Sequence, residues 1–315
     1  MDERTLDLRE HEQRLRAAVT AGDAKEMLAC AMGAELALAL RDTDEGLGLS
    51  PVSEGERSRI EALVGKAIAA ALAGRGKGKP ASAEQCCQAA ALLWEQRREE
   101  RGEDALRLAK AAAHSDPGGR AEYLLGLFAF HGFGRGRSHE ESLAHHLKAA
   151  ARGCGDAMFE LYAMTAQGLG CDPSPREAIA WCVRAAEAGS VRAMAKMGGL
   201  HASGNGLKKD PGKAVLWYER AARAGHAKAA ATLGVIYATG DDIDEDEDRA
   251  REFFALAEKL GFDWKAEARK VGLRPEAYVG PPHKKAASED EEGAESAAAP
   301  VKAKRGRRKA KAEAE

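Results

Sequence analysis

Glycine and alanine recur at intervals of 36 residues through the middle of this 315-residue chain, and this period constrains the fold more than any other feature. One series of glycines comprises Gly153, Gly189, Gly225 and Gly261, and one series of alanines comprises Ala121, Ala157, Ala193 and Ala229. A period of this length is typical of one helix-turn-helix hairpin per repeat. A lone hairpin cannot bury its apolar face, whereas a stack of hairpins can. We therefore predict four stacked units, at about residues 118–153, 154–189, 190–225 and 226–261.

The composition favours helices throughout the chain. Aromatic residues make up only 5% of it, and Ala, Leu, Glu, Arg and Lys dominate while β-branched residues are scarce, a balance that suits helices better than sheets. The second helix of each unit is predicted to begin after a residue whose side-chain oxygen caps the free amides of a first turn. These capping residues are Ser138, Ser174, Asp210 and Asp246. The fold class that we expect is all-α.

The third unit carries a recognisable pattern of small, aromatic and capping residues. Its members are Gly204, Asn205, Gly206, Asp210, Ala214, Trp217, Tyr218, Ala221, Ala222 and Gly225. This pattern resembles the Sel1-like repeat, a relative of the tetratricopeptide repeat. The resemblance implies an α-solenoid of stacked helix-turn-helix repeats. It also implies a non-catalytic adaptor or scaffold that binds a protein or peptide through its concave surface, in a signalling or regulatory assembly.

A candidate partner-binding groove follows from the same resemblance, because the first helix of each hairpin lines the concave side in tetratricopeptide stacks. The side chains that this analogy places there are Tyr123, Leu127, Phe130, His131, Phe159 and Gln167. An aromatic-walled groove of this kind suits a partner helix or an extended peptide. The alternative is that Phe128 and Phe130 belong to the core between repeats.

The segments that flank the repeats differ from them in composition and register. The domain organisation that we predict is an N-terminal helical cap or small bundle at residues 1–73, a basic Gly-rich linker at 74–81, a degenerate tetratricopeptide-like helical pair at 82–117, the four repeats at 118–261, a capping helix at 262–281, and a disordered tail at 282–315.

The tail is acidic first and basic afterwards, with its strongest cationic cluster at Lys304, Arg305, Arg307, Arg308 and Lys309. Such a cluster attracts phosphates in a salt-dependent way. The second hypothesis for function is therefore a nucleic-acid-associated regulator, in which the tail contacts DNA or RNA while the repeats hold a protein partner. The simpler interpretation is a solubilising or partner-docking tail.

Chemistry-bearing residues form no catalytic or metal-binding pattern in the sequence. The six cysteines fall at irregular positions, which favours reduced thiols over a repeated disulfide. His139, His145 and His146 lack the i, i+4 spacing of a helical zinc site. We expect no cofactor, no metal and no enzymatic activity. A third hypothesis, an enzyme with an unrecognised site, requires a pocket lined by converging titratable groups.

The sequence also indicates where in the cell the protein is located. Its apolar runs are far shorter than the roughly 18 residues that cross a bilayer, and the amino terminus lacks the apolar segment of a secretory signal. We therefore expect no membrane association and a cytoplasmic location. The net charge of −2 gives the whole chain no polyanion-binding character.

Overall fold

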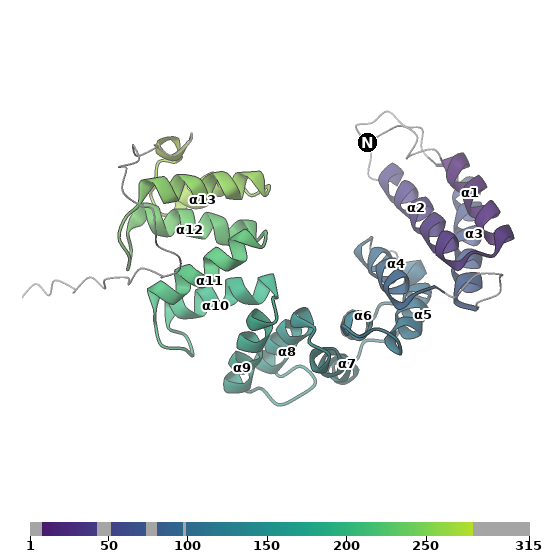
Figure 1. The fold of residues 1–315 in the computed structure, drawn as a ribbon, viewed down its shortest axis with the longest axis horizontal. Helices are drawn as coiled ribbons and strands as arrows, with labels where there is room; N and C mark the ends of the chain where they lie inside the picture. The colour runs from purple at the N-terminus through teal and green to yellow at the C-terminus, as the bar shows by residue number, and fades with distance from the viewer. Residues whose placement is uncertain (1–7, 43–51, 74–80, 97–98, 280–315) are drawn as a thin grey trace, which may run out of the picture. The chain divides into compact units, whose positions relative to one another are not determined.

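Helices account for all the regular secondary structure in the part of the chain that the computed structural model describes, residues 8–42, 52–73, 81–96 and 99–279 (Figure 1). The chain divides into two compact units, Met1–Ser174 and Pro175–Glu315. The all-α prediction is confirmed for the described residues.

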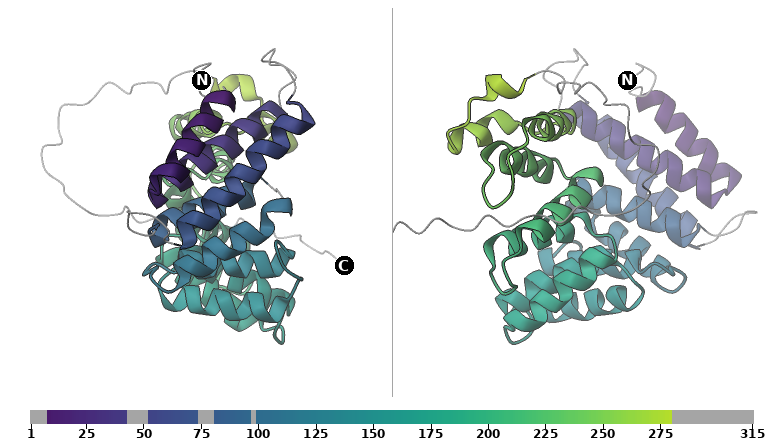
Figure 2. Two further views of the ribbon diagram at one scale, coloured as in Figure 1. Left: turned by 90° about the vertical axis from the view of Figure 1, so that its right-hand side faces the viewer. Right: turned by 60° about the vertical axis from the view of Figure 1, so that its left-hand side comes forward.

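The described residues of the first unit form eight α-helices and one 3-10 turn: α1 (Leu8–Ala21), α2 (Ala24–Asp42), α3 (Glu54–Ala73), α4 (Ala83–Glu95), η2 (Glu99–Arg101), α5 (Gly102–Ala113), α6 (Arg120–His131), α7 (His139–Ala151) and α8 (Gly155–Gln167). The second unit contains α9 (Pro175–Glu187), α10 (Val191–Ser203), α11 (Pro211–Arg223), α12 (Ala227–Thr239), α13 (Glu247–Lys259), α14 (Trp264–Lys270) and the 3-10 turn η3 (Pro275–Tyr278). Figure 2 shows these helices from two further sides.

The predicted helix starts are formed by the predicted caps. The side-chain oxygens of Ser138, Asp210 and Asp246 each accept a hydrogen bond from the backbone N–H three residues later. Ser82 forms a complete capping box, because its hydroxyl accepts from the Gln85 N–H while the Gln85 side chain accepts from the Ser82 N–H. Local sequence therefore determines where these helices begin.

The first helix of each repeat ends at a glycine in the left-handed conformation. The glycines are Gly132, Gly168, Gly204 and Gly240, with φ between 64° and 81°. A second glycine with positive φ follows two residues later in three repeats, and Asp242 takes its place in the fourth. Asp242 is the one non-glycine residue with positive φ among the described residues, at 63°, and aspartate tolerates this conformation better than most residues.

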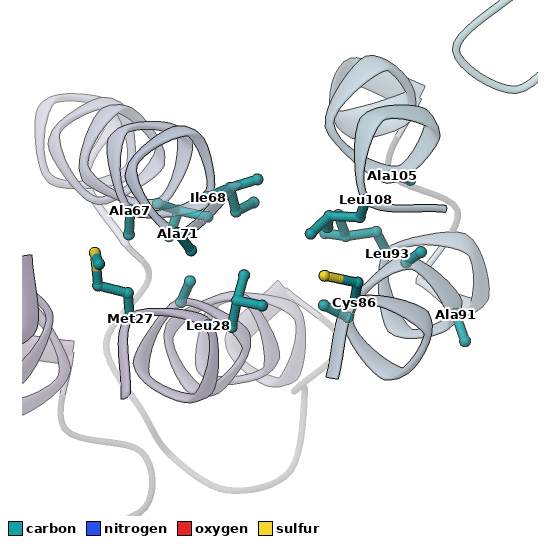
Figure 3. Packing of buried hydrophobic residues seen from close by; sticks show 14 of the residues in the cluster. Met27, Leu28, Ala67, Ile68, Ala71, Cys86, Ala91, Leu93, Ala105 and Leu108 are labelled. Atoms are coloured by element: carbon teal, nitrogen blue, oxygen red, sulfur yellow. The ribbon is translucent and has the colours of Figure 1, made fainter. Parts of the chain in front are cut away.

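Hairpins stack in the first unit beyond the four periodic repeats. Helix α2 packs against α4, α4 packs against α6, and α3 packs against α5. Leu28, Ile68, Leu93 and Leu108 point into the space between the α2–α3 and α4–α5 hairpins, and all four are buried (Figure 3). Helices α2 and α3 thus form a further hairpin of the stack, and α1 packs on both of them.

The predicted domain boundaries remain predictions. The interpretation of residues 1–73 as a helical cap is refined by the α2–α3 stacking. Most of the predicted linker, residues 74–80, and the whole predicted tail, 282–315, lie outside the described residues.

Three repeats share a close contact between a glycine of the first helix and a ring of the second. The pairs are Gly126 with His146, Gly198 with Tyr218, and Gly234 with Phe254. A Cβ atom at any of these glycines would lie 2.5–2.7 Å from the nearest ring atom. The absence of a side chain on the first helix therefore lets the ring of the second helix reach the helix backbone. We call these contacts glycine–ring pairs.

The second unit ends in an aromatic core. The rings of Phe254 and Trp264 stack with centroids 4.1 Å apart, and the Tyr278 ring meets Phe254 edge-on at 5.4 Å. Trp264 begins α14, two residues after the start of the predicted capping segment at 262–281. This short helix covers apolar side chains of α12 and α13 that no further repeat covers in the described part of the chain.

Candidate protein-binding surface

Four of the predicted groove residues lie on one stripe of α6. Tyr123, Leu127, Phe130 and His131 are spaced so that they share one face of a helix, and each is at least partly exposed. Phe128, on the opposite face, is fully buried in the core of the first unit. Of the two phenylalanines that were open to a core interpretation, Phe128 is core and Phe130 is not.

Aromatic rings from three helices meet at the C-terminal end of this stripe. The His131 ring lies 4.9 Å from Trp94 of α4 and 5.0 Å from Phe130, and the Phe130 ring lies 4.9 Å from His139 of α7, all between centroids. The Arg137 guanidinium lies over the Phe130 ring at 5.5 Å. We call Trp94, Phe130, His131, His139 and Arg137 the aromatic cluster. The cluster combines the apolar area of its rings with the cationic guanidinium of Arg137 and with the ring nitrogens of Trp94 and the two histidines, which can form hydrogen bonds.

Sequence reasoning did not place His139, Arg137 or Trp94 in the groove, and the signal was weakest for Trp94. It lies in α4, where the 36-residue period does not extend, so no repeat register placed it beside α6. Its ring also contacts the buried rings of Phe128 and Phe133, with centroids 5.9 and 5.3 Å away. Trp94 is thus anchored in the core on one side and partly exposed on the other.

The remaining predicted groove residues have other surroundings. The Tyr123 ring lies 5.8 Å from the buried ring of His146, measured between centroids. On α8, the Phe159 ring lies 5.5 Å from that of Tyr162, and Gln167 is exposed at the end of the helix. The structure therefore brings Phe130 and His131 together in one cluster and places Phe159 and Gln167 on a different helix.

A hollow of about 330 Å³ lies between α2 and α4. It is lined by Lys25, Leu28, Ala29 and Met32 of α2 and by Gln85, Gln88, Ala89 and Leu92 of α4. We call it the α2–α4 groove. Sequence reasoning did not find it, although one signal was available: between Glu26 and Glu35 the sequence has no charged residue, so α2 has apolar side chains on its outward face as well. A smaller hollow of about 160 Å³ lies between α12 and α14 in the second unit.

The comparisons with known proteins agree with this geometry. The Sel1 repeat family model matches residues 119–154, 156–190, 191–226 and 227–262. The crystal structure of a Sel1 repeat protein from Oxalobacter formigenes is 31% identical, with a TM-score of 0.54, and the match covers 64% of this chain and 83% of that one. The chain belongs to the Sel1 repeat family. No curated protein sequence is similar enough to count as a match.

A second solved structure is more distant from this Sel1 repeat protein. It is a protective antigen present in uropathogenic Escherichia coli strains, described as displaying an SLR fold. It is 18% identical, with a TM-score of 0.47, and the match covers 83% of this chain and 68% of that one.

The Sel1 repeats begin and end within two residues of the four predicted units, and the predicted resemblance to Sel1-like repeats is confirmed. Helices α1 to α5 lie outside the matched residues. Sel1 repeat proteins are generally non-catalytic scaffolds that bind protein partners, and this chain has their fold.

The cysteines of this Sel1 repeat protein are all free thiols. Burial raises the pKa of the Cys87 thiol to about 12 and that of Cys182 to about 11, so both remain protonated at neutral pH. Within the described ranges, no three His, Cys, Asp or Glu side chains lie together as metal ligands would. No helix in those ranges has both the length and the apolar character to span a bilayer.

The basic residues predicted to contact nucleic acid or an acidic partner lie outside the described residues. They are Lys304, Arg305, Arg307, Arg308 and Lys309. Their role, like that of the predicted groove residues, stays a prediction from the sequence.

Proposed function

We propose that this Sel1 repeat protein is a non-catalytic scaffold of a cytoplasmic signalling or regulatory assembly, and that it binds a protein or peptide partner through the first helices of its hairpins. The observation that carries the proposal is the aromatic cluster, together with the exposed stripe of α6 that leads to it. Tyr123 and Leu127 extend the cluster along α6, so the surface continues over two helical turns.

The physical reason is that large rings left partly in water give binding energy at little conformational cost. Aromatic and arginine side chains dominate the energetics of protein interfaces, and they lose few rotatable bonds on binding. In the cluster, Trp94 is held by core contacts with Phe128 and Phe133, and Phe130 is held between His131 and His139. The rings are therefore ordered before a partner arrives, which reduces the entropic cost of binding.

The test is a full-length Tyr123→Ala/Phe130→Ala variant, compared with the wild type in affinity capture from the native cell and in thermal melting. We expect proteins captured by the wild type to be lost while the melting temperature falls by only a few degrees, because both side chains are partly exposed. The matched control is Leu147→Ala. Leu147 lies on α7, the second helix of its hairpin, and its side chain is 43% exposed. Its replacement should leave capture unchanged.

Two results would contradict the proposal. Capture that is the same for wild type and variant means that the α6 stripe does not bind the partner. A fall in melting temperature of more than about 10 °C means that the two rings serve the core. Nucleic-acid contact through the tail is a separate hypothesis that no described residue supports.

A further inference from the structure

The turn between α10 and α11 carries Asn205, the only asparagine in the 315-residue chain, and a glycine follows it. The other three repeats have Phe133, Leu169 and Asp241 at the corresponding position. Asparagine before glycine is the pair most prone to lose the side-chain amide. The reason is that glycine has no side chain to hinder the attack of its backbone nitrogen on the asparagine side chain.

The structure leaves both reacting groups accessible. Asn205 and Gly206 are exposed. The Asn205 backbone N–H donates to the Ser203 hydroxyl at 3.3 Å. The Asn205 side chain and the Gly206 N–H, however, form no hydrogen bond with any residue that the structure describes. The Gly206 nitrogen is therefore not held by an acceptor, and the Asn205 carboxamide can rotate toward it.

We propose that Asn205 is a site of spontaneous deamidation, and that its isoaspartyl product loosens the α10–α11 turn. Solvent hydroxide takes the proton of the Gly206 N–H, and the nitrogen attacks the side-chain carbonyl carbon of Asn205. The carboxamide nitrogen takes up a proton and leaves as ammonia, so that a five-membered succinimide ring forms. Water then opens the ring at either carbonyl. One product is an aspartyl residue with the original main chain, and the other is an isoaspartyl residue, whose main chain runs through the side chain.

The isoaspartyl product lengthens the main chain by one CH2 group inside a closed turn. The base of the turn is fixed, because the Asp210 N–H donates to the His201 carbonyl at 2.9 Å. Its tip is packed on α9, since a Cβ atom at Gly206 would collide with the Cδ1 atom of Ile179. The added carbon therefore displaces Gly206 from Ile179 or strains the position of Asp210, whose carboxylate caps α11.

The aspartyl product keeps the original main chain and should leave the turn intact. The fourth repeat already has Asp241 at this position, so a carboxylate is compatible with the fold of the repeat. The loosening is thus an effect of the rerouted main chain and not of the new charge.

The test compares freshly purified full-length protein with protein aged in a mildly alkaline buffer. Peptide mapping by mass spectrometry should show deamidation at Asn205 at a rate within about tenfold of that in the urea-unfolded chain, because the folded turn gives little protection. An isoaspartate-specific methyltransferase should label the aged protein only. The amides of Asp210, Lys213 and Ala214, which are hydrogen-bonded at the base of the turn, should exchange with solvent at least about threefold faster after ageing.

The matched control is Asn205→Gln, aged in the same way, because glutamine has to close a six-membered ring and reacts far more slowly. This variant should show neither isoaspartate at position 205 nor faster exchange, which separates deamidation from other effects of ageing. Fresh Asn205→Asp carries the charge without the rerouted chain, and its amides should exchange as those of the fresh wild type do.

Three results overturn the proposal. Deamidation of Asn205 confined to the urea-unfolded chain means that the folded turn protects this residue. Unchanged exchange in aged protein that contains isoaspartate means that the turn absorbs the extra carbon. Equally fast exchange in fresh Asn205→Asp means that charge, and not the rerouted chain, is responsible. The partner-binding surface on α6 is tested separately by the variant at Tyr123 and Phe130.

Discussion

Arg101 joins three helices of the first unit through one buried guanidinium group. Its Nε donates to Glu35 Oε1 of α2 at 2.9 Å, its Nη2 donates to the Glu61 carbonyl of α3 at 2.6 Å, and its Nη1 donates to Asp104 Oδ2 of α5 at 3.2 Å. Glu35 is fully buried and Arg101 is 8% exposed. We predict that Arg101→Met strongly destabilises the attachment of the α2–α3 hairpin.

The magnitude follows from the burial of both charges. Removing one member of a buried ion pair typically costs about 3–5 kcal/mol, because the other charge is left without its partner in a medium of low dielectric constant. Replacing both members with apolar residues is often neutral or even stabilising. We therefore expect Arg101→Met to cost about 3 kcal/mol or more, and Arg101→Met/Glu35→Met to cost much less than the sum of the two single changes.

The assay is native-state hydrogen exchange of the α2 and α3 amides, because it reports the stability of this hairpin separately from the second unit. The control is Arg107→Met, since Arg107 is 61% exposed and pairs with the exposed Glu103 and, at 3.9 Å, with Asp104, and ion pairs of an exposed side chain contribute about 0–1 kcal/mol. A cost below about 1 kcal/mol for Arg101→Met, or strict additivity in the double variant, would refute the reasoning.

Three further results are expected. Gly234→Ala should destabilise the second unit by about 1–3 kcal/mol in urea unfolding, because the new Cβ lies 2.5 Å from the Phe254 ring and that ring is fixed by stacking. Cys87 and Cys182 should react very slowly with a disulfide reagent at pH 8, since their raised pKa values keep both thiols neutral. The same shifts make stability depend on pH, because a thiol of the unfolded chain has a pKa near 9 while Cys87 and Cys182 in the folded protein have pKa values of about 12 and 11. Above pH 9 the unfolded chain alone gains free energy by ionising these thiols. Their contribution to stability is therefore complete below pH 9 and is lost as pH rises toward 12. Removing residues 282–315, which hold nine basic residues, should lower the salt concentration at which the protein leaves heparin.

Each of these has a control or a contradicting outcome. Gly199→Ala places its Cβ 3.4 Å from the Tyr218 hydroxyl, so it should cost less than Gly234→Ala, and equal costs contradict the clash. The partly exposed Cys154 and Cys171 should react first, and a faster reaction at Cys87 contradicts its burial. Equal heparin retention with and without the tail at about 100 mM salt excludes the nucleic-acid hypothesis.

The sequence predicted those features that depend on neighbouring residues. The glycines that end the first helices and the Ser and Asp caps that begin the second helices act within a few residues, so the period located the four repeats closely. Phe128 and Phe130 could not be separated in the same way, because which of them faces the core depends on how α4 and α6 pack.

The α2–α3 hairpin shows where sequence reasoning fails. Residues 24–73 carry no 36-residue period, and the ion pair between Glu35 and Arg101 that ties this hairpin to α5 joins residues 66 positions apart. Trp94 and the α2–α4 groove depend on the same packing. The candidate surface was therefore predicted on α6 and α8, and the neighbouring features on α4 and α2 required the structure.

The glycine–ring pairs bear on how the length of such a protein changes in evolution. Gly126 with His146, Gly198 with Tyr218 and Gly234 with Phe254 each form inside a single repeat, 20 residues apart. Duplicating one 36-residue segment of the gene therefore adds a hairpin that brings its own internal contact, with no matching substitution needed in the older hairpins. Stacks with different numbers of repeats, and so with binding surfaces of different length, are accessible by single duplications or deletions.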